Sequence, residues 1–344
     1  MAECHLPLSR GRKPAPGQTN AAVHRFFKSG RCLAPDASKE CGASIDSHTI
    51  SRSTALGAIA EAGHVSRLRV LGQAEPTVEK VGWRSASTFR GFCSRHDNAL
   101  FAPLEKTAFV ATPEQCMLLA YRSVCFELFL KQAVVNSAPE TRRMLQTGVP
   151  KAQQKRAARA ILPFEHASEL GLRDLIARKA ELDADVAGMR NRVLRHLVMR
   201  FAGEPIVAFS GGFVPDADLD GVPLQNYRDE TRHLEPIVLN MIPGPNESVL
   251  LISWRRSSNV GIRFVDGLVN ALPETLAEWA PQLGFLFLDN TYFSQQWWDT
   301  RRKYVRRHLI HLAGTWGPTE SNHTFLDRNV SGWNLTGLEL IPDR

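Results

Sequence analysis

The sequence lacks both a membrane-spanning segment and a secretory signal. Its richest apolar run, residues 116–130, is interrupted by Arg122 and Glu127, and a helix needs about 20 predominantly apolar residues to cross a bilayer. The N-terminus has no cationic region followed by an apolar stretch, which is the pattern of a secretory signal. We therefore expect a cytoplasmic protein with no membrane insertion.

Cysteine is scarce, and the short motifs of several enzyme classes are missing. Six cysteines among 344 residues are too few for a disulfide framework, so we expect thiols or metal ligands in a reducing compartment. Gly211, Gly212 and Gly261 lack the spacing, and the following Lys and Ser or Thr, of a phosphate-binding loop. A serine-hydrolase elbow is also missing. Nucleotide-dependent enzymes and serine hydrolases are therefore disfavoured.

The composition is that of a globular protein with a basic surface. Hydrophobic residues make up 43% of the chain and charged residues 22%, which leaves enough apolar surface to build cores. The formal net charge of +7 favours an anionic partner, nucleic acid first, because clustered Lys and Arg neutralise phosphates. The alternative is a basic surface without a specific role.

The clearest helix start is the sequence Thr112-Pro113-Glu114-Gln115. Thr can cap the helix, Pro fits its first position, and Gln completes a capping box. Apolar residues spaced three and four apart then predict a helix that ends at the break in residues 136–139. The same spacing over residues 175–197 predicts a second long helix that packs on the first.

The C-terminal part changes to short apolar runs separated by Gly, Pro and Asn. Residues 237–242 and 249–254 flank a six-residue loop and predict an antiparallel hairpin. Two further helices are predicted, one around residues 274–279 and one from Ser294 to Leu312. Helices and an antiparallel sheet in separate stretches indicate the α+β class.

Four side chains in the N-terminal third have the chemistry and spacing of a zinc site. Cys32 and Cys41 lie on a loop rich in Pro, Asp, Ser and Gly, and Cys93 and His96 form a tight pair three residues apart. Thiolate and imidazole are ligands that Zn²⁺ accepts, and four of them close a tetrahedral structural site. The alternative is two ordinary loop cysteines and a surface histidine.

The order of these residues resembles a treble clef, in which a knuckle, a hairpin and a helix start surround one zinc ion. Cys32 and Cys41 would form the knuckle, although eight residues separate them where two to four are usual in treble clefs. Cys93 and His96 would lie at the start of the helix. Residues 31–108 are therefore predicted to be a zinc-stabilised domain.

The same segment also resembles the HNH, or ββα-metal, endonucleases. His48, in Asp46-Ser-His-Thr-Ile50, stands where that family has its water-activating histidine, and Asp97 follows His96 at the position of the catalytic metal ligand. The resemblance implies His48 as general base and Asp97 as ligand of a second divalent ion such as Mg²⁺. It also departs from the family, because Asp replaces its His and an insertion of about forty residues separates the two halves.

Four parts are predicted along the chain. Residues 1–30 form a flexible basic arm, 31–108 the zinc-binding treble-clef or HNH-like domain, 109–200 a helical region, and 201–344 an α+β C-terminal domain. Basic residues gather between positions 140 and 160, and again in a late segment beside two tryptophans. Both stretches are candidates for phosphate contacts, and the alternative for each is a solvated helix face.

Two functions are left open by these patterns. The first is an intracellular zinc-binding protein that binds DNA or RNA and acts as a metal-dependent endonuclease through His48. The second is a non-catalytic scaffold that binds a protein partner, in which zinc only replaces the core that so short a domain cannot build. Loss of activity in His48→Ala with zinc still bound would separate them.

Overall fold

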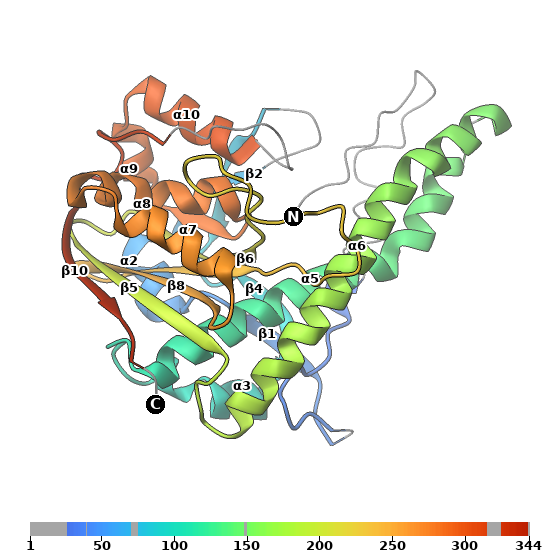
Figure 1. Ribbon diagram of the computed structural model, residues 1–344, viewed down its shortest axis with the longest axis horizontal. Helices are drawn as coiled ribbons and strands as arrows, with labels where there is room; N and C mark the ends of the chain where they lie inside the picture. Colours follow the sequence, from blue (N-terminus) through green and yellow to red (C-terminus); the bar gives the residue numbers. More distant parts are fainter. Residues whose placement is uncertain (1–25, 39, 70–74, 148–149, 315–324, 343–344) are drawn as a thin grey trace.

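An eight-stranded antiparallel sheet forms the centre of the protein, and helices cover both of its faces (Figure 1). The computed structural model describes residues 26–38, 40–69, 75–147, 150–314 and 325–342. The predicted arm, residues 1–30, lies outside the described residues except for its last five positions. The α+β class is confirmed, with a helical hairpin between the N-terminal strands and the C-terminal sheet strands.

The strand order in the sheet is β10-β5-β8-β7-β6-β9-β2-β3. The strands are β2 (His64–Arg69), β3 (Thr77–Gly82), β5 (Leu194–Ala202), β6 (Val207–Phe213), β7 (Ile237–Pro243), β8 (Glu247–Arg255), β9 (Thr291–Phe293) and β10 (Asn334–Leu340). The predicted hairpin is confirmed as β7 and β8, whose last paired residues are Pro243 and Ser248. The turn between them is therefore shorter than the six-residue loop expected.

Side chains of the central strands alternate between two apolar cores. On β7, Ile237 and Leu239 join the core under the C-terminal helices, whereas Val238 joins the core under the helical hairpin. Successive side chains of a strand point to opposite faces, so a strand that is buried on both faces reads as a continuous apolar run. This explains the short, uninterrupted apolar runs in the sequence.

The helical hairpin consists of α5 (Pro113–Gln146) and α6 (Lys151–Ala187), whose far ends project from the body (Figure 1). The predicted start of α5 is confirmed, because the Thr112 hydroxyl accepts the Gln115 N–H and Gln115 returns the bond to the Thr112 backbone. The predicted end is wrong, since α5 continues through Pro139 for two more turns. Packing along α6 holds the helix where proline removes one backbone hydrogen bond.

The second predicted helix ends earlier than the sequence pattern suggested. A turn after α6 leads into β5, so Val193 and Leu197 are a linker and a strand residue instead of helix residues. Met189 takes a positive φ of 48° in this turn. The Asp185 carboxylate accepts the N–H groups of Arg192 and Val193, each at 2.8 Å. The predicted helical region, residues 109–200, therefore ends in a sheet strand.

The C-terminal helices cover the sheet face opposite the hairpin. They are α7 (Asn259–Val269), α8 (Pro273–Phe287), α9 (Gln295–Thr300) and α10 (Lys303–Gly314). Residues 274–279 lie in α8 as predicted, but the helix predicted from Ser294 to Leu312 is two helices. Arg301 is extended at the break, with ψ of 141°, and its guanidinium donates to the Val330 carbonyl at 3.2 Å.

The N-terminal elements are divided between a small sheet and the central one. The strands β1 (Ser44–His48) and β4 (Thr88–Cys93) pair with each other, and η1 (Arg52–Leu56), α2 (Gly57–Ile59), β2 and β3 lie between them in sequence. Strand β2 pairs with β9 through Ser66 and Phe293. Within the predicted domain 31–108, β1 and β4 therefore form a sheet of their own, whereas β2 and β3 extend the central sheet.

The helices α3 (Ser94–Leu100) and α4 (Ala102–Glu105) follow β4 and pack beside the start of α5. Phe92 and Phe101 are fully buried there, with their rings edge to face at a centroid distance of 5.0 Å. This contact packs β4 and the start of α3 against the apolar core under the helical hairpin. None of the described helices is long and apolar enough to cross a membrane.

Candidate metal centre

The four predicted ligands lie together in the fold. Their ligand atoms, three Sγ and one ring nitrogen, are all within 4.8 Å of one another. His96 Nδ1 lies 3.2 Å from Cys32 Sγ, 3.4 Å from Cys41 Sγ and 3.3 Å from Cys93 Sγ. Zinc bonds of about 2.3 Å to sulfur and about 2.0 Å to nitrogen give a sulfur–nitrogen edge of about 3.5 Å in a tetrahedron. The cluster therefore has dimensions close to those of a site for one ion.

Local structure explains why each pair of ligands reaches this point. Cys93 ends β4 and is the N-cap of α3, so the two-residue spacer places His96 in the first helical turn. Leu33, next to Cys32, donates its N–H to the Gly91 carbonyl at 2.8 Å and ties the first ligand to β4. Cys41 follows a turn in which its N–H bonds the Ser38 carbonyl at 3.1 Å.

The environment of the cluster favours a thiolate at Cys93. Burial opposes ionisation, but the His96 backbone N–H, the Cys32 thiol, the His96 ring and the Cys41 thiol together lower the pKa of Cys93 to about 7. The pKa of Cys32 is raised, first by its burial. The thiolate is the metal-binding form of cysteine. Cys93 is therefore the cysteine of the cluster that deprotonates most readily at neutral pH to bind a cation.

The second nitrogen of His96 faces a carboxylate. The imidazole is 7% exposed, and its Nε2 lies 3.2 Å from Asp36 Oδ1. The contact does not have hydrogen-bond geometry, and Nε2 has no hydrogen-bond partner among the described residues. A ligating histidine usually donates its other N–H to a carboxylate, which fixes the ring and makes the metal-binding nitrogen more basic. A small movement of the exposed Asp36 side chain completes that bond.

The other cysteines do not belong to the cluster. Cys116 and Cys125 are fully buried on α5, and burial raises the pKa of each to about 12. They are small core residues of the helix. Cys4 lies outside the described residues.

The two positions taken from the nuclease resemblance lie on different elements, His48 at the end of β1 and Asp97 on α3. Ser44 at the start of β1 pairs with Cys93, whereas His48 at its end pairs with Thr88. Four strand residues span about 13 Å, so β1 separates His48 from the helix start that carries Asp97. The His48 Nε2–H donates to the Arg84 carbonyl at 3.0 Å, and burial lowers the pKa of His48. Asp97 Oδ1 is buried and has no partner among the described residues.

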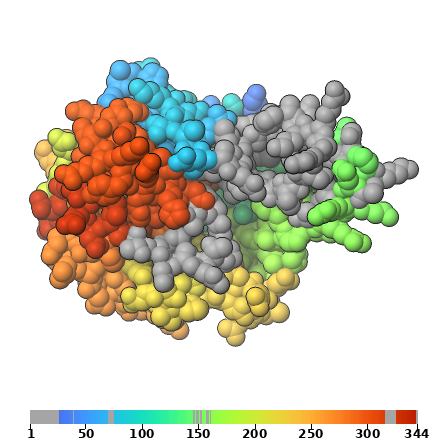
Figure 2. All heavy atoms as spheres, turned by 90° about the horizontal axis from the view of Figure 1, so that it is seen from above, coloured from blue at the N-terminus to red at the C-terminus, as the bar shows by residue number. Residues whose placement is uncertain are grey.

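The two basic segments differ in their surroundings. The described residues 142–147 and 150–160 lie at the projecting end of the hairpin, which Figure 2 shows in green at one side of the molecule. There Arg142 pairs with Glu165, whereas the others are exposed: Arg143, Lys155, Arg156 and Arg159. Near α10 the tryptophans Trp297 and Trp298 are buried in the core, so they offer no stacking surface beside the late basic stretch.

Two residues that support the metal centre were not found from the sequence. One is Asp36, an ordinary acidic residue of a polar loop. The other is Tyr121 on α5, whose hydroxyl lies 2.8 Å from the Leu33 carbonyl and 2.7 Å from Asp183 Oδ1. It anchors the chain next to Cys32 from a position 88 residues away. No local pattern predicts a contact over that separation.

Sequence and structure were compared with known proteins to find relatives of this arrangement. Models of protein families, curated proteins and solved structures gave no match. The assignment of the centre therefore depends on the chemistry and geometry of its own residues.

Proposed function

We propose that this protein binds one Zn²⁺ through Cys32, Cys41, Cys93 and His96, and that the ion has a structural role. The observation that carries the proposal is the convergence of the four ligand atoms within 4.8 Å. Four protein ligands fill a tetrahedral zinc site and leave no position for a substrate. The group Cys32, Cys41, Cys93 and His96 is also the only one of its kind among the described residues, since no other set of three or more metal-binding side chains converges there.

The segment that the ion would hold has little core of its own. Leu33 and Ala34 are buried, but the described residues from Pro35 to Ile45 are half-buried or exposed. A metal bound by such a segment replaces the apolar contacts it lacks, because the binding free energy becomes folding free energy. The order of loop, strand pair β1–β4 and helix α3 supports the treble-clef interpretation, with the excursion through β2 and β3 inserted between the two strands.

Metal analysis of the purified full chain tests the proposal. We expect one zinc per chain in the natural sequence and none in Cys93→Ser. The matched control is Cys125→Ala, which removes a cysteine outside the cluster and should leave one zinc in place. Zinc retained by Cys93→Ser, or no zinc in the natural chain purified without chelator, would contradict the proposal.

Our second proposal is that the protein binds nucleic acid. The exposed basic side chains at the end of the hairpin support it. Four cations without acidic partners among the described residues lie on this projecting surface and suit a phosphate backbone, whereas Arg142 is already paired with Glu165. Replacing Arg143, Lys155, Arg156 and Arg159 by Gln should abolish binding to duplex DNA or RNA at low salt. The natural chain should lose affinity as salt rises, with a logarithmic slope of about 3 to 4 for four phosphate contacts.

Cleavage is not part of this proposal. It requires His48 and a divalent ion held by Asp97 to meet at one phosphate, and the length of β1 lies between them. Divalent-dependent nicking that disappears in His48→Ala with zinc still bound would establish the endonuclease interpretation. Unchanged behaviour of His48→Ala supports a non-catalytic protein that uses its zinc domain to bind a partner.

A further inference from the structure

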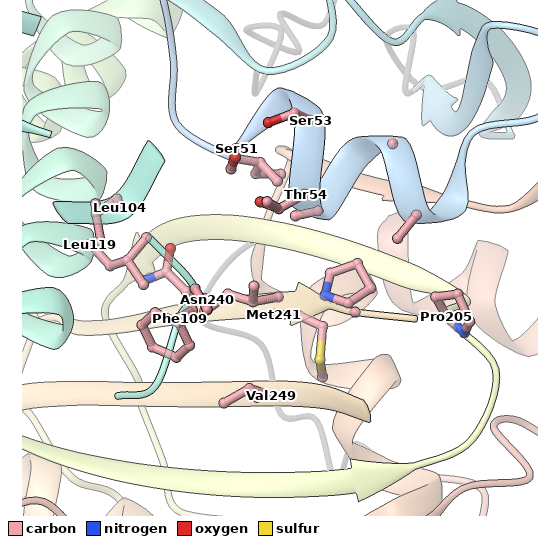
Figure 3. A pocket seen from close by; sticks show the side chains of 18 of the residues that line it. Ser51, Ser53, Thr54, Leu104, Phe109, Leu119, Pro205, Asn240, Met241 and Val249 are labelled. Carbon is pink, nitrogen blue, oxygen red and sulfur yellow. The ribbon is translucent and has the colours of Figure 1, made fainter. Parts of the chain in front are cut away.

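A cavity of about 600 Å³ lies away from the metal centre, between η1, the start of α5 and the turn from β7 to β8 (Figure 3). Its volume is within the range of about 300–1,000 Å³ that small-molecule sites occupy. Ser51, Ser53 and Thr54 lie on one side of it, and Met241 and Val249 lie on the sheet strands opposite (Figure 3). Neither proposed function uses this space.

Most of the lining is apolar. Segments far apart in the sequence contribute to it, among them Leu104, Phe109, Leu119, Phe209, Met241 and Val249. A concave apolar surface favours the apolar body of a ligand over water, because contact with the ligand removes both surfaces from solvent. The lining therefore indicates a ligand that is hydrocarbon or aromatic.

The packing of the protein leaves part of this apolar lining uncovered. Phe109 and Ile242 are half-buried, although both are large apolar residues. Leu104 and Leu119 belong to the core under the helical hairpin, yet each is still 7% exposed. Covering such surface stabilises a complex by about 25 cal/mol for each Å² removed from water.

Gln115 holds one wall of the cavity in place. Its Nε2 donates to the Pro103 carbonyl at 3.0 Å and the Ala108 carbonyl at 2.8 Å, and its Oε1 accepts the Val110 N–H at 2.9 Å. These three bonds fix the loop that supplies Phe109. The wall is thus preformed, so a ligand does not have to order it.

The charges beside the cavity are balanced within the protein. Among the described residues that line it, only Arg122 and Glu247 carry a charge. Arg122 is 2% exposed, and its Nη1 donates to Glu105 Oε1 at 2.8 Å. Glu247 Oε1 accepts a bond from Arg200 Nη1 at 2.8 Å. A charged ligand would lose its hydration in an apolar space without gaining a free counter-charge, so the cavity favours an uncharged one.

The hydroxyl groups of the lining are either bonded within the protein or exposed to solvent. Ser51 Oγ donates to Glu105 Oε2 at 3.2 Å, and Thr107 Oγ1 donates to a backbone carbonyl at 2.6 Å. Ser53 and Thr54 are exposed residues, so water can satisfy their hydroxyls. None of these groups requires a polar ligand.

The two deepest polar residues of the lining belong to the hydrogen bonding of the core. Thr49 and Asn240 are each 1% exposed. Thr49 Oγ1 accepts a bond from Asn290 Nδ2 at 2.8 Å, and Asn240 Oδ1 accepts the Ser123 hydroxyl at 3.1 Å. They present almost no polar surface to a ligand, which leaves apolar contact as the basis of binding.

From these observations we infer that the cavity binds a small, uncharged hydrocarbon or aromatic molecule through apolar contact. The ligand needs no group that donates or accepts a directed hydrogen bond. The inference is independent of the metal, because no ligand of the metal centre lines the cavity. Its failure would leave both proposed functions intact.

Two fluorescent compounds that differ by one charged group test the class of ligand. N-phenyl-1-naphthylamine is uncharged, and its fluorescence rises when it leaves water. Added to the full, zinc-loaded chain, it should bind saturably at one site. 1-Anilinonaphthalene-8-sulfonate has the same rings and one sulfonate, and it should bind at least about tenfold more weakly, because the anion loses its hydration.

Variants that fill the cavity locate the uncharged compound. Ala58 and Ala108 line the cavity from different segments, and neither is fully buried, so a larger side chain can enter the cavity from each. Ala58→Trp and Ala108→Trp should each remove binding while zinc content stays at one per chain. Ala180→Trp, at an exposed position of α6, should bind the compound as the natural chain does.

Three results would overturn the inference. Absence of saturable binding by N-phenyl-1-naphthylamine would remove the site. Binding that persists in both cavity-filling variants would place the site elsewhere, and if one variant does not fold, the other decides alone. Equal or tighter binding of the sulfonate would show that the site does not select an uncharged ligand.

Discussion

The central sheet and the segment around Cys32 and Cys41 reach a defined structure by different means. Strands β7 and β8 are apolar on both faces, and helices cover each face. The segment from Pro35 to Ile45 has no fully buried side chain among its described residues, yet it carries one of four ligand atoms that converge within 4.8 Å. One region is ordered by apolar burial, and the other, in our proposal, by a metal ion.

This difference predicts which change should destabilise each region. Apolar cores lose stability in proportion to the side-chain volume removed, and the whole cooperative unit loses it together. A metal-held segment loses its structure when one ligand or the ion is lost, while the rest of the fold keeps its own core. The four predictions that follow test this contrast, beginning with the largest expected effect.

Zinc removal should have the largest effect, and the effect should be local. Structural zinc contributes about 10–16 kcal/mol of apparent binding free energy in zinc-finger peptides, more than any single core substitution. After treatment with a chelator, we expect faster hydrogen–deuterium exchange in residues 31–48 and 93–100. The amides of β7 and β8 should keep their protection. Equal loss of protection in both regions, or in neither, would break the comparison.

Removing side-chain volume from the core of the sheet should lower the stability of the whole fold and leave the zinc bound. Ile252 on β8 is fully buried, and Ile252→Ala should lower the free energy of unfolding by about 2–5 kcal/mol with one zinc still bound. The control is Ile176→Ala on α6, whose side chain is 51% exposed and should cost less than about 0.5 kcal/mol. Denaturant unfolding of the two variants gives both values. A smaller loss for Ile252→Ala than for Ile176→Ala contradicts the two-core description.

The Asp36 carboxylate beside His96 should increase zinc affinity without being a zinc ligand itself. Asp36→Ala removes the acceptor that faces Nε2 and should weaken zinc affinity by about 10-fold to 100-fold, as loss of a carboxylate that orients a metal-binding histidine does. Glu40→Ala, an exposed acid on the same loop, is the matched control for charge. Competition with a chromophoric chelator measures both. If the two variants lose affinity equally, Asp36 acts only through its charge.

Acid should act on the sheet through His196, which is fully buried between Asn191 and Ser253. Burial, and then the charge of Arg256, lower the pKa of His196 from 6.5 to about 3. Between these values the unfolded chain binds a proton that the folded chain refuses, so stability is complete above the unfolded pKa and falls as pH falls.

The matching variant is His196→Gln, which removes this titration from the fold. From pH 6.5 to about pH 5 the natural chain should lose up to about 2 kcal/mol more than the variant, at about 1.4 kcal/mol for each pH unit. Acid also displaces zinc from thiolates, but that loss is common to both chains. Urea unfolding of each chain at the two pH values measures the difference. Parallel pH profiles would exclude His196 as the source.

Local signals in the sequence predicted the elements whose structure is decided locally. The capping box at Thr112 marked the start of α5, and two apolar runs marked β7 and β8. Helix ends were predicted less well, because they depend on partners elsewhere in the fold. Pro139 remains helical through packing on α6, and helix α6 ends at a turn that the Asp185 carboxylate stabilises. The pairing of β2 with β9 has no local signal at all.

The candidate site, like the fold, was predicted from the sequence only where local signals decide it. Ligand type and spacing were enough to select Cys32, Cys41, Cys93 and His96, because few residue types bind zinc. Position along the chain was not enough to show that β1 separates His48 from the start of α3, which carries Asp97, since that depends on strand register.

X-ray absorption at the zinc edge of the purified full chain tests the central claim most directly. Our account predicts one zinc with three sulfur neighbours at about 2.3 Å and one nitrogen neighbour at about 2.0 Å. In Cys93→Ser, which should bind no zinc, the zinc edge and this shell should be lost. A shell made mainly of oxygen, or the same three-sulfur shell in Cys93→Ser, would contradict it.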